Sequence, residues 1–184
     1  FLYDRRRRIF SIGYRLAEAL VQAGLPKGAL NFVTGAAGEV GPVITESPVV
    51  RAISFTGSTA AGEQIHRAAP LTTRTQMELG GKNPLIVMED ADLDRAVDLA
   101  IKGGLSLTGQ ACTGTSRLLV HSAVKAAFTD KLVSKIKQLK VGSGMDPKSE
   151  IGPLATRKQL ETVLRYVDIG KSEAKHLHGG ERLK

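Results

Sequence analysis

Residues 49–62, VVRAISFTGSTAAG, give the clearest indication of the fold in this chain. The apolar, β-branched start is typical of a buried strand that ends at Phe55, and the small and hydroxyl residues after it predict a turn into a helix. Gly57 allows a tight turn, Ser58 opens the helix, and Gly62 would let that helix pack closely on the sheet. Free N–H groups at such a helix start suit a phosphate, although an ordinary strand–turn–helix fits equally well.

Strands and helices alternate on both sides of this stretch. Strands are predicted at residues 30–33, 49–55, 75–79, 84–88, 117–120 and 174–178. Helices are predicted at residues 14–23, 60–69, 91–105, 122–140 and 154–169, with Ser122 as an N-cap. This alternation predicts an α/β fold built from βαβ units, with a parallel sheet covered on both faces.

The composition is that of a globular protein. Of 184 residues, 42% are hydrophobic and 24% are charged. The net charge is +8, but the run Arg5–Arg8 supplies four of these charges, and aromatic residues make up only 4%. Neither a broad basic surface nor stacking aromatics are evident, so we expect no nucleic-acid partner.

The single cysteine, Cys112, excludes an intramolecular disulfide, so nothing in the sequence indicates an oxidising compartment. No apolar run reaches the roughly 18 residues that a membrane-spanning helix needs. Residues 1–10 lack the apolar core of a signal peptide. We therefore expect a cytoplasmic protein with no membrane partner.

Two further motifs carry residues with chemical potential. In MELGGK, residues 77–82, Glu78 ends an apolar strand, where a carboxylate faces the ligand crevice of an α/β sheet and can act as a general base. In GQACTGTSR, residues 109–117, small neighbours leave the Cys112 sulfur approachable and backbone N–H groups free for an oxyanion. Taken singly, a solvated strand-end glutamate and a buried, inert cysteine remain alternatives.

No group of Cys, His, Asp and Glu residues has the spacing of metal ligands, so no metal site is predicted. His176 and His178 would share one face of a short strand, and we interpret them as surface residues. The lysines of the helix at 122–140 are interpreted as a solvated face.

In this order, FTGST, MELGGK and GQACTGTSR resemble the NAD(P)-dependent aldehyde dehydrogenase superfamily, with Glu78 and Cys112 34 positions apart. The flanking stretches AGLPKGALNFVTG (23–35), DADLDRAV (90–97) and IGPLATRKQ (151–159) are similar too. Within the superfamily, LTGQACTGTSR and YVDIGKSEAKHLHGGERL look most like the α-ketoglutaric semialdehyde (2,5-dioxovalerate) dehydrogenase branch.

The resemblance implies a function and a site. Cys112 would attack an aldehyde and pass through a thiohemiacetal and a thioester, and Glu78 would be the general base that activates water for hydrolysis. Gly57 and Ser58 would contact the pyrophosphate of NAD or NADP, with Leu79 and Gly80 beside the nicotinamide. Family members are homo-oligomers, either dimers or tetramers, so we expect the same of the full-length enzyme.

The resemblance also implies a domain plan. Residues 14–79 would be the C-terminal part of a Rossmann-type NAD(P)-binding domain, and residues 80–184 the N-terminal part of the α/β catalytic domain. Residues 1–13 form a basic segment that does not match the family. The family pattern continues on both sides, so we expect a partial chain that is not competent by itself. The alternative function is a truncated, non-catalytic fragment.

Overall fold

A computed structural model describes the chain from residue 8 to residue 182. The chain divides into two compact units, Phe1–Gly80 and Gly81–Lys184. The run Arg5–Arg8 lies mostly outside the described residues, and the first helix begins at its last arginine.

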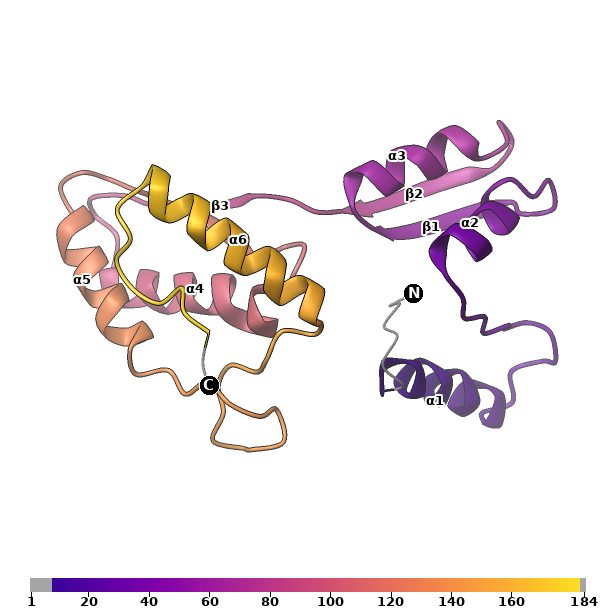
Figure 1. Cartoon of the computed structure of the whole chain (residues 1–184), viewed down its shortest axis with the longest axis horizontal. Helices are drawn as coiled ribbons and strands as arrows, with labels where there is room; N and C mark the ends of the chain where they lie inside the picture. Colours follow the sequence, from indigo (N-terminus) through magenta and orange to yellow (C-terminus); the bar gives the residue numbers. More distant parts are fainter. Residues whose placement is uncertain (1–7, 183–184) are drawn as a thin grey trace. The chain divides into compact units, whose positions relative to one another are not determined.

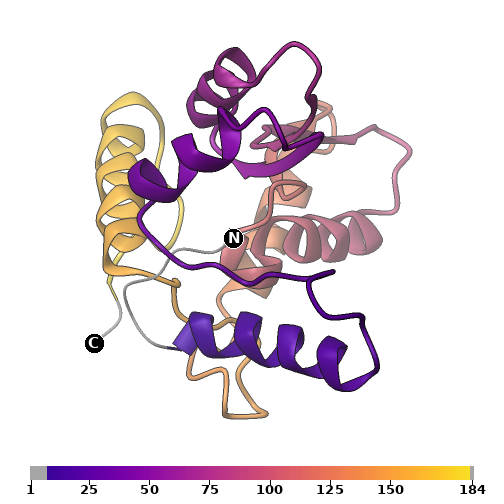
Figure 2. The same ribbon diagram turned by 90° about the vertical axis from the view of Figure 1, so that its right-hand side faces the viewer.

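The first unit contains one parallel strand pair and three helices (Figure 1). Its elements are α1 (Arg8–Gln22), α2 (Ala37–Thr45), β1 (Ala52–Gly57), α3 (Thr59–Ala68) and β2 (Arg74–Leu79). β1 and β2 pair in register from Ala52 opposite Arg74 to Gly57 opposite Leu79. Helix α3 connects the strands and lies along both of them (Figure 1, Figure 2). This arrangement is a βαβ unit.

Close packing of α3 on the strands depends on a glycine, as the sequence predicts. Gly62 is buried, and a Cβ at this position would lie 2.8 Å from Leu79 Cδ2. The Thr73 hydroxyl also donates to the Val50 carbonyl at 2.9 Å, which ties the start of β2 to the segment before β1. These contacts fix the register in which the two strands end side by side.

The second unit repeats the same plan. Its elements are β3 (Asn83–Val87), α4 (Leu93–Leu105), a 3₁₀ turn η1 (Ser106–Gly109), β4 (Thr115–Val120), α5 (Lys125–Ile136) and α6 (Arg157–Glu173). β3 and β4 are parallel, with Leu85 opposite Leu118 and Val87 opposite Val120. The fold class is therefore α/β with parallel strands, as predicted.

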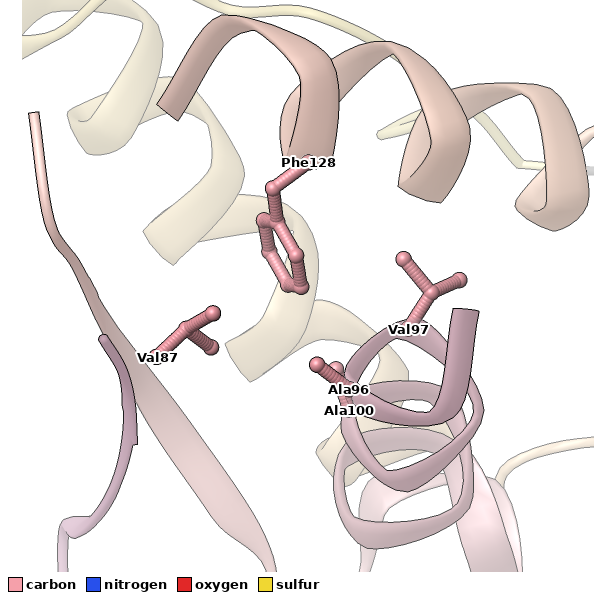
Figure 3. Close-up of a cluster of buried hydrophobic side chains, with 5 residues drawn as sticks. All are labelled: Val87, Ala96, Val97, Ala100 and Phe128. Carbon is pink, nitrogen blue, oxygen red and sulfur yellow. The ribbon is translucent and has the colours of Figure 1, made fainter. Parts of the chain in front are cut away.

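A small hydrophobic core holds β3, α4 and α5 together. Phe128 of α5 is only 1% exposed, and its ring points toward Val87 of β3 and toward Ala96, Val97 and Ala100 of α4 (Figure 3). On the outer surface Lys131 bonds Asp94 at 2.5 Å. This hydrogen bond and the lysine's charge hold the pKa of the Asp94 carboxyl below its usual range.

Two predicted strands do not form. Residues 30–33 and 174–178 have no strand structure, so His176 and His178 do not share a strand face. Both stretches have suitable residues, but a strand also needs a neighbouring backbone to pair with, and local sequence does not provide one. Each stretch remains irregular in the part of the chain that the structure describes.

Two further details differ from the sequence expectations. Helix α5 begins at Lys125 with Val124 as its cap residue, so Ser122 lies in the turn before the helix and is not its N-cap. Within residues 8–182, the face of β3 and β4 opposite α4 is exposed, in contrast to the expected cover on both faces. Ile86 and Leu119 alternate with the core residues of these strands and are 64% and 51% exposed, and α4 packs on the other face.

Candidate functional site

In the first unit, five predicted site residues come together at the carboxyl end of the strand pair. Gly57 and Leu79 are direct register partners, and Glu78 lies opposite Thr56. Ser58 follows Gly57 at the start of α3, and Gly80 follows Leu79. The carboxyl ends of parallel strands are where α/β sheets bind ligands. The structure thus brings the predicted cofactor residues and the predicted base to one edge.

The Glu78 side chain is exposed at this edge. Its Oε1 accepts a hydrogen bond from Gln76 Nε2 at 3.2 Å, two residues earlier on the same face of β2. An exposed carboxylate can accept a proton from water. A solvated strand-end glutamate would have the same surroundings.

The start of α3 has the features of an anion-binding turn. Ser58 is the N-cap, and its Oγ accepts a hydrogen bond from the Ala61 N–H at 3.3 Å. The earlier N–H groups of a helix have no partner within the helix, and they favour negative charge in front of it. Pyrophosphate has the charge and the acceptor oxygens that this helix start can bind.

In the second unit, Cys112 lies exposed on a turn between η1 and β4. The part of the alternative that makes this cysteine buried is therefore wrong. The turn closes through the Gly114 N–H, which donates to the Ala111 carbonyl at 3.0 Å. Asn83, the first residue of β3, donates from Nδ2 to the Cys112 carbonyl at 3.2 Å. The main chain at the sulfur is therefore fixed by a side chain 29 residues earlier.

The backbone just before this turn is left-handed at three consecutive residues. Leu107, Thr108 and Gly109 have φ angles of 52°, 60° and 68°. For a residue with a Cβ this conformation costs roughly 1–2 kcal/mol, and more strain is expected at a β-branched threonine. The surroundings must therefore hold Leu107 and Thr108 in place.

Two side chains just before this turn form hydrogen bonds with a distant loop. The Thr108 hydroxyl donates to the Gly152 carbonyl at 3.3 Å, and Gln110 Oε1 accepts from the Ala155 N–H at 3.3 Å. Sequence reasoning missed both residues and the role of this loop. Glycine at position 109 was the only local sign of a left-handed turn, because leucine and threonine rarely adopt one.

The predicted base and the predicted nucleophile belong to different units, Glu78 to the first and Cys112 to the second. Within the described residues 8–182, no three His, Cys, Asp or Glu side chains are grouped so that they could hold a metal ion. Over the same residues, no helix is long and apolar enough to cross a membrane.

Comparison with known proteins identifies the family. The sequence profile of the aldehyde dehydrogenase family matches residues 9–184. The chain belongs to the aldehyde dehydrogenase family. The match covers the strand-end residues, Glu78 and the Cys112 turn, and it begins inside the segment 1–13.

Two solved structures are similar to most of this chain. HpcC from Thermus thermophilus aligns with a TM-score of 0.90 and 40% identity, over 94% of this chain and 34% of that one. Betaine aldehyde dehydrogenase (betB) from Staphylococcus aureus, solved in complex with NAD⁺, aligns with a TM-score of 0.89 and 37% identity, over 94% of this chain and 35% of that one. This aldehyde dehydrogenase chain therefore spans about a third of the length of these relatives.

Proposed function

We propose that this chain carries the catalytic residues of an NAD(P)-dependent aldehyde dehydrogenase, which oxidises an aldehyde to a carboxylate. The observation that carries the proposal is the exposed position of Cys112, the only cysteine, on a pinned turn in a chain of this family. An exposed thiol with small neighbours can reach a carbonyl carbon. A buried cysteine could not take this role.

We propose that the cofactor binds at the carboxyl edge of β1 and β2. The Ser58-capped helix start fits the pyrophosphate, and the Phe55 ring fills the space that a Cβ at Gly57 would occupy. Leu79 and Gly80 would flank the nicotinamide; no described atom lies within 4 Å of the Cβ position at Gly80. When bound, NAD or NADP supplies the hydride acceptor. A relative was solved with NAD⁺, which supports NAD and does not exclude NADP.

The residues of the chain divide the reaction into two parts. The Cys112 thiolate adds to the aldehyde carbon, and the backbone N–H of Cys112 helps to stabilise the oxyanion that forms. After loss of the hydride, the substrate is held on sulfur as a thioester. Glu78 takes a proton from a water molecule, the water oxygen adds to the thioester carbon, and the carbon–sulfur bond breaks to release thiolate and a carboxylic acid, which loses its proton to solvent.

For the substrate we propose a semialdehyde, with α-ketoglutaric semialdehyde as the first candidate. The support is the similarity of the sequence around Cys112 and of residues 166–183 to that branch. One structural relative is named betaine aldehyde dehydrogenase, so betaine aldehyde is the natural competing substrate. We further propose that the full-length enzyme is a homo-oligomer, a dimer or a tetramer.

The test follows the thioester on the whole chain. The chain is incubated with NAD⁺ or NADP⁺ and α-ketoglutaric semialdehyde or betaine aldehyde, and intact mass and nicotinamide reduction are recorded. An acyl adduct on Cys112 would support the proposal and would show that the partial chain forms the thioester by itself, contrary to the expectation from its sequence. In Glu78→Gln this adduct should accumulate, because loss of a general base slows hydrolysis by about 10²–10⁴-fold. Cys112→Ser should form none.

Glu63→Gln is the matched control, since Glu63 is an exposed glutamate on α3 of the same unit. It should behave as the unchanged chain does. If neither the unchanged chain nor Glu78→Gln forms an adduct with any pair of aldehyde and cofactor, the chain is the non-catalytic fragment that the sequence offers as the alternative.

A further inference from the structure

The backbone that leads into the Cys112 turn has a conformation that must be held by contacts from elsewhere in the fold. Its left-handed approach, Leu107–Gly109, includes two residues that rarely adopt positive φ. An exposed turn of this kind would relax to another conformation unless contacts from elsewhere hold it. The cysteine would then lose a fixed position relative to its backbone N–H.

Two of the contacts that hold this backbone come from one distant segment. Thr108 Oγ1 donates to the Gly152 carbonyl, and Gln110 Oε1 accepts from the Ala155 N–H, both at 3.3 Å. The paired residues are 44 and 45 positions apart in sequence. One bond lies at the middle residue of the left-handed stretch and the other lies just after its end. All of these residues belong to the second unit.

The remote segment is itself anchored. The Gly142 N–H donates to the Ile151 carbonyl at 2.9 Å, and Val141 and Ile151 form an isolated parallel bridge. On its other side, Thr156 caps α6 by accepting from the Gln159 N–H at 3.1 Å. Gly152 and Ala155 therefore lie between two fixed points and can hold the cysteine turn.

We propose that Thr108 and Gln110 are positioning residues. Their hydrogen bonds to the segment Gly152–Ala155 hold the Cys112 turn and so keep the nucleophile in one conformation. Neither side chain acts on substrate; both act through the backbone that carries Cys112. The proposal rests on the proposed role of Cys112 for its functional meaning. The conformational claim can be measured without any catalytic turnover.

The experiment uses the single cysteine as a reporter. Cys112 is alkylated with a trifluoromethyl reagent, and the ¹⁹F NMR spectrum of the whole chain is recorded. One narrow line is expected, because the turn has one conformation. Thr108→Val, which has nearly the same shape and the same strain at positive φ, removes only the hydroxyl, and Gln110→Leu removes only the acceptor. Each should broaden the line or add a second one.

The expected size follows from the loss of one hydrogen bond. Each variant should lower the ratio of native to displaced turn about fivefold, equal to about 1 kcal/mol. The double variant should lower it further. Thr108→Ser and Gln110→Glu keep a donor and an acceptor, so each should restore the single line. Amide exchange at Ala155 should quicken in Gln110→Leu and return to the original rate in Gln110→Glu.

Thr129→Val is the matched control. Thr129 Oγ1 donates to the Lys125 carbonyl at 2.7 Å within α5, so this variant also loses one threonine hydrogen bond in the same unit. It should leave the ¹⁹F line unchanged, and circular dichroism should show all variants folded. If Thr108→Val does not fold, the pair Gln110→Leu and Gln110→Glu decides the question.

The proposal is overturned if the unchanged chain shows several lines, if Thr108→Val and Gln110→Leu give its spectrum, or if Thr129→Val broadens the line equally. Acyl-adduct formation on the same unlabelled proteins is recorded separately. A chain that shows the expected lines but forms no adduct refutes the proposed function and supports the positioning role of Thr108 and Gln110. If all variants form the adduct equally well and their ¹⁹F lines are unchanged, the positioning role of Thr108 and Gln110 alone is refuted.

Discussion

Gly103 gives the most direct test of how the second unit is packed beneath the cysteine turn. It lies in the last part of α4, where an added Cβ would clash with Thr115 Oγ1 and would lie 3.2 Å from Thr115 Cβ. Rotating the hydroxyl away would relieve only the first contact, because the Cβ is fixed to the backbone of β4. Gly103→Ala therefore forces α4 away from the start of β4.

The size of the effect comes from two opposing contributions. Replacing glycine by alanine within a helix stabilises it by about 1 kcal/mol. Overpacking a close contact costs about 1–3 kcal/mol. We expect Gly103→Ala to lower the free energy of unfolding by about 1 kcal/mol, the difference between these contributions. The opposite sign is expected at Gly170 of α6, where no described atom lies within 4 Å of the Cβ position.

Urea unfolding followed by far-ultraviolet circular dichroism measures both changes. Gly170→Ala should raise the free energy of unfolding by about 0.5–1 kcal/mol, as an unhindered helical glycine should. Thr115→Ala should restore part of the stability lost in Gly103→Ala, because it removes the nearer of the two contacts. The packing argument fails if Gly103→Ala is as stabilising as Gly170→Ala, or if Thr115→Ala makes no difference.

Three other substitutions test the same unit by similar unfolding measurements. Phe128→Ala should lower the free energy of unfolding by about 3–5 kcal/mol, since the ring is the largest buried side chain of the core; a loss below about 1 kcal/mol would contradict the buried position. Asp92→Ala should cost about 0.5–2 kcal/mol, because the carboxylate caps α4 by accepting from the N–H groups of Asp94 and Arg95. Lys131→Met should remove the contribution of the Lys131–Asp94 ion pair to the free energy of unfolding. This contribution is fully present above the unfolded Asp94 pKa of about 3.9 and is lost as the pH falls through the lower folded pKa. The difference between Lys131→Met and the unchanged chain should therefore shrink with acid and with salt, and a constant difference would refute this role for the ion pair.

The fold could be predicted from sequence where local signals and pairing agree. The stretch up to Phe55 is apolar and β-branched, and Ser58 is a good cap, so β1 and α3 form close to where they are expected. Residues 30–33 have the same strand character and still form no strand. The difference lies in pairing: β1 finds β2 through α3, whereas no described strand lies beside residues 30–33.

The candidate site also has one part that the sequence predicts and one part that it does not. Glu78, Leu79, Gly57 and Ser58 could be placed at one edge because parallel strands end together and a βα turn fixes the helix start. The surroundings of Cys112 could not. A free cysteine is more often buried than exposed, and a bond between Thr108 and Gly152 spans 44 positions with no local trace.

The two proposed catalytic residues therefore depend on different kinds of support. Glu78 lies on a strand whose position is set by a backbone ladder, and a ladder survives most side-chain substitutions nearby. Cys112 lies on a turn that follows two strained residues, and side chains of Asn83, Thr108 and Gln110 hold this part of the chain. Each of those bonds is removed by one substitution. Changes outside the chemical groups should consequently disturb the thiol step more often than the hydrolytic step, and residues 152–155 should influence it from far along the sequence.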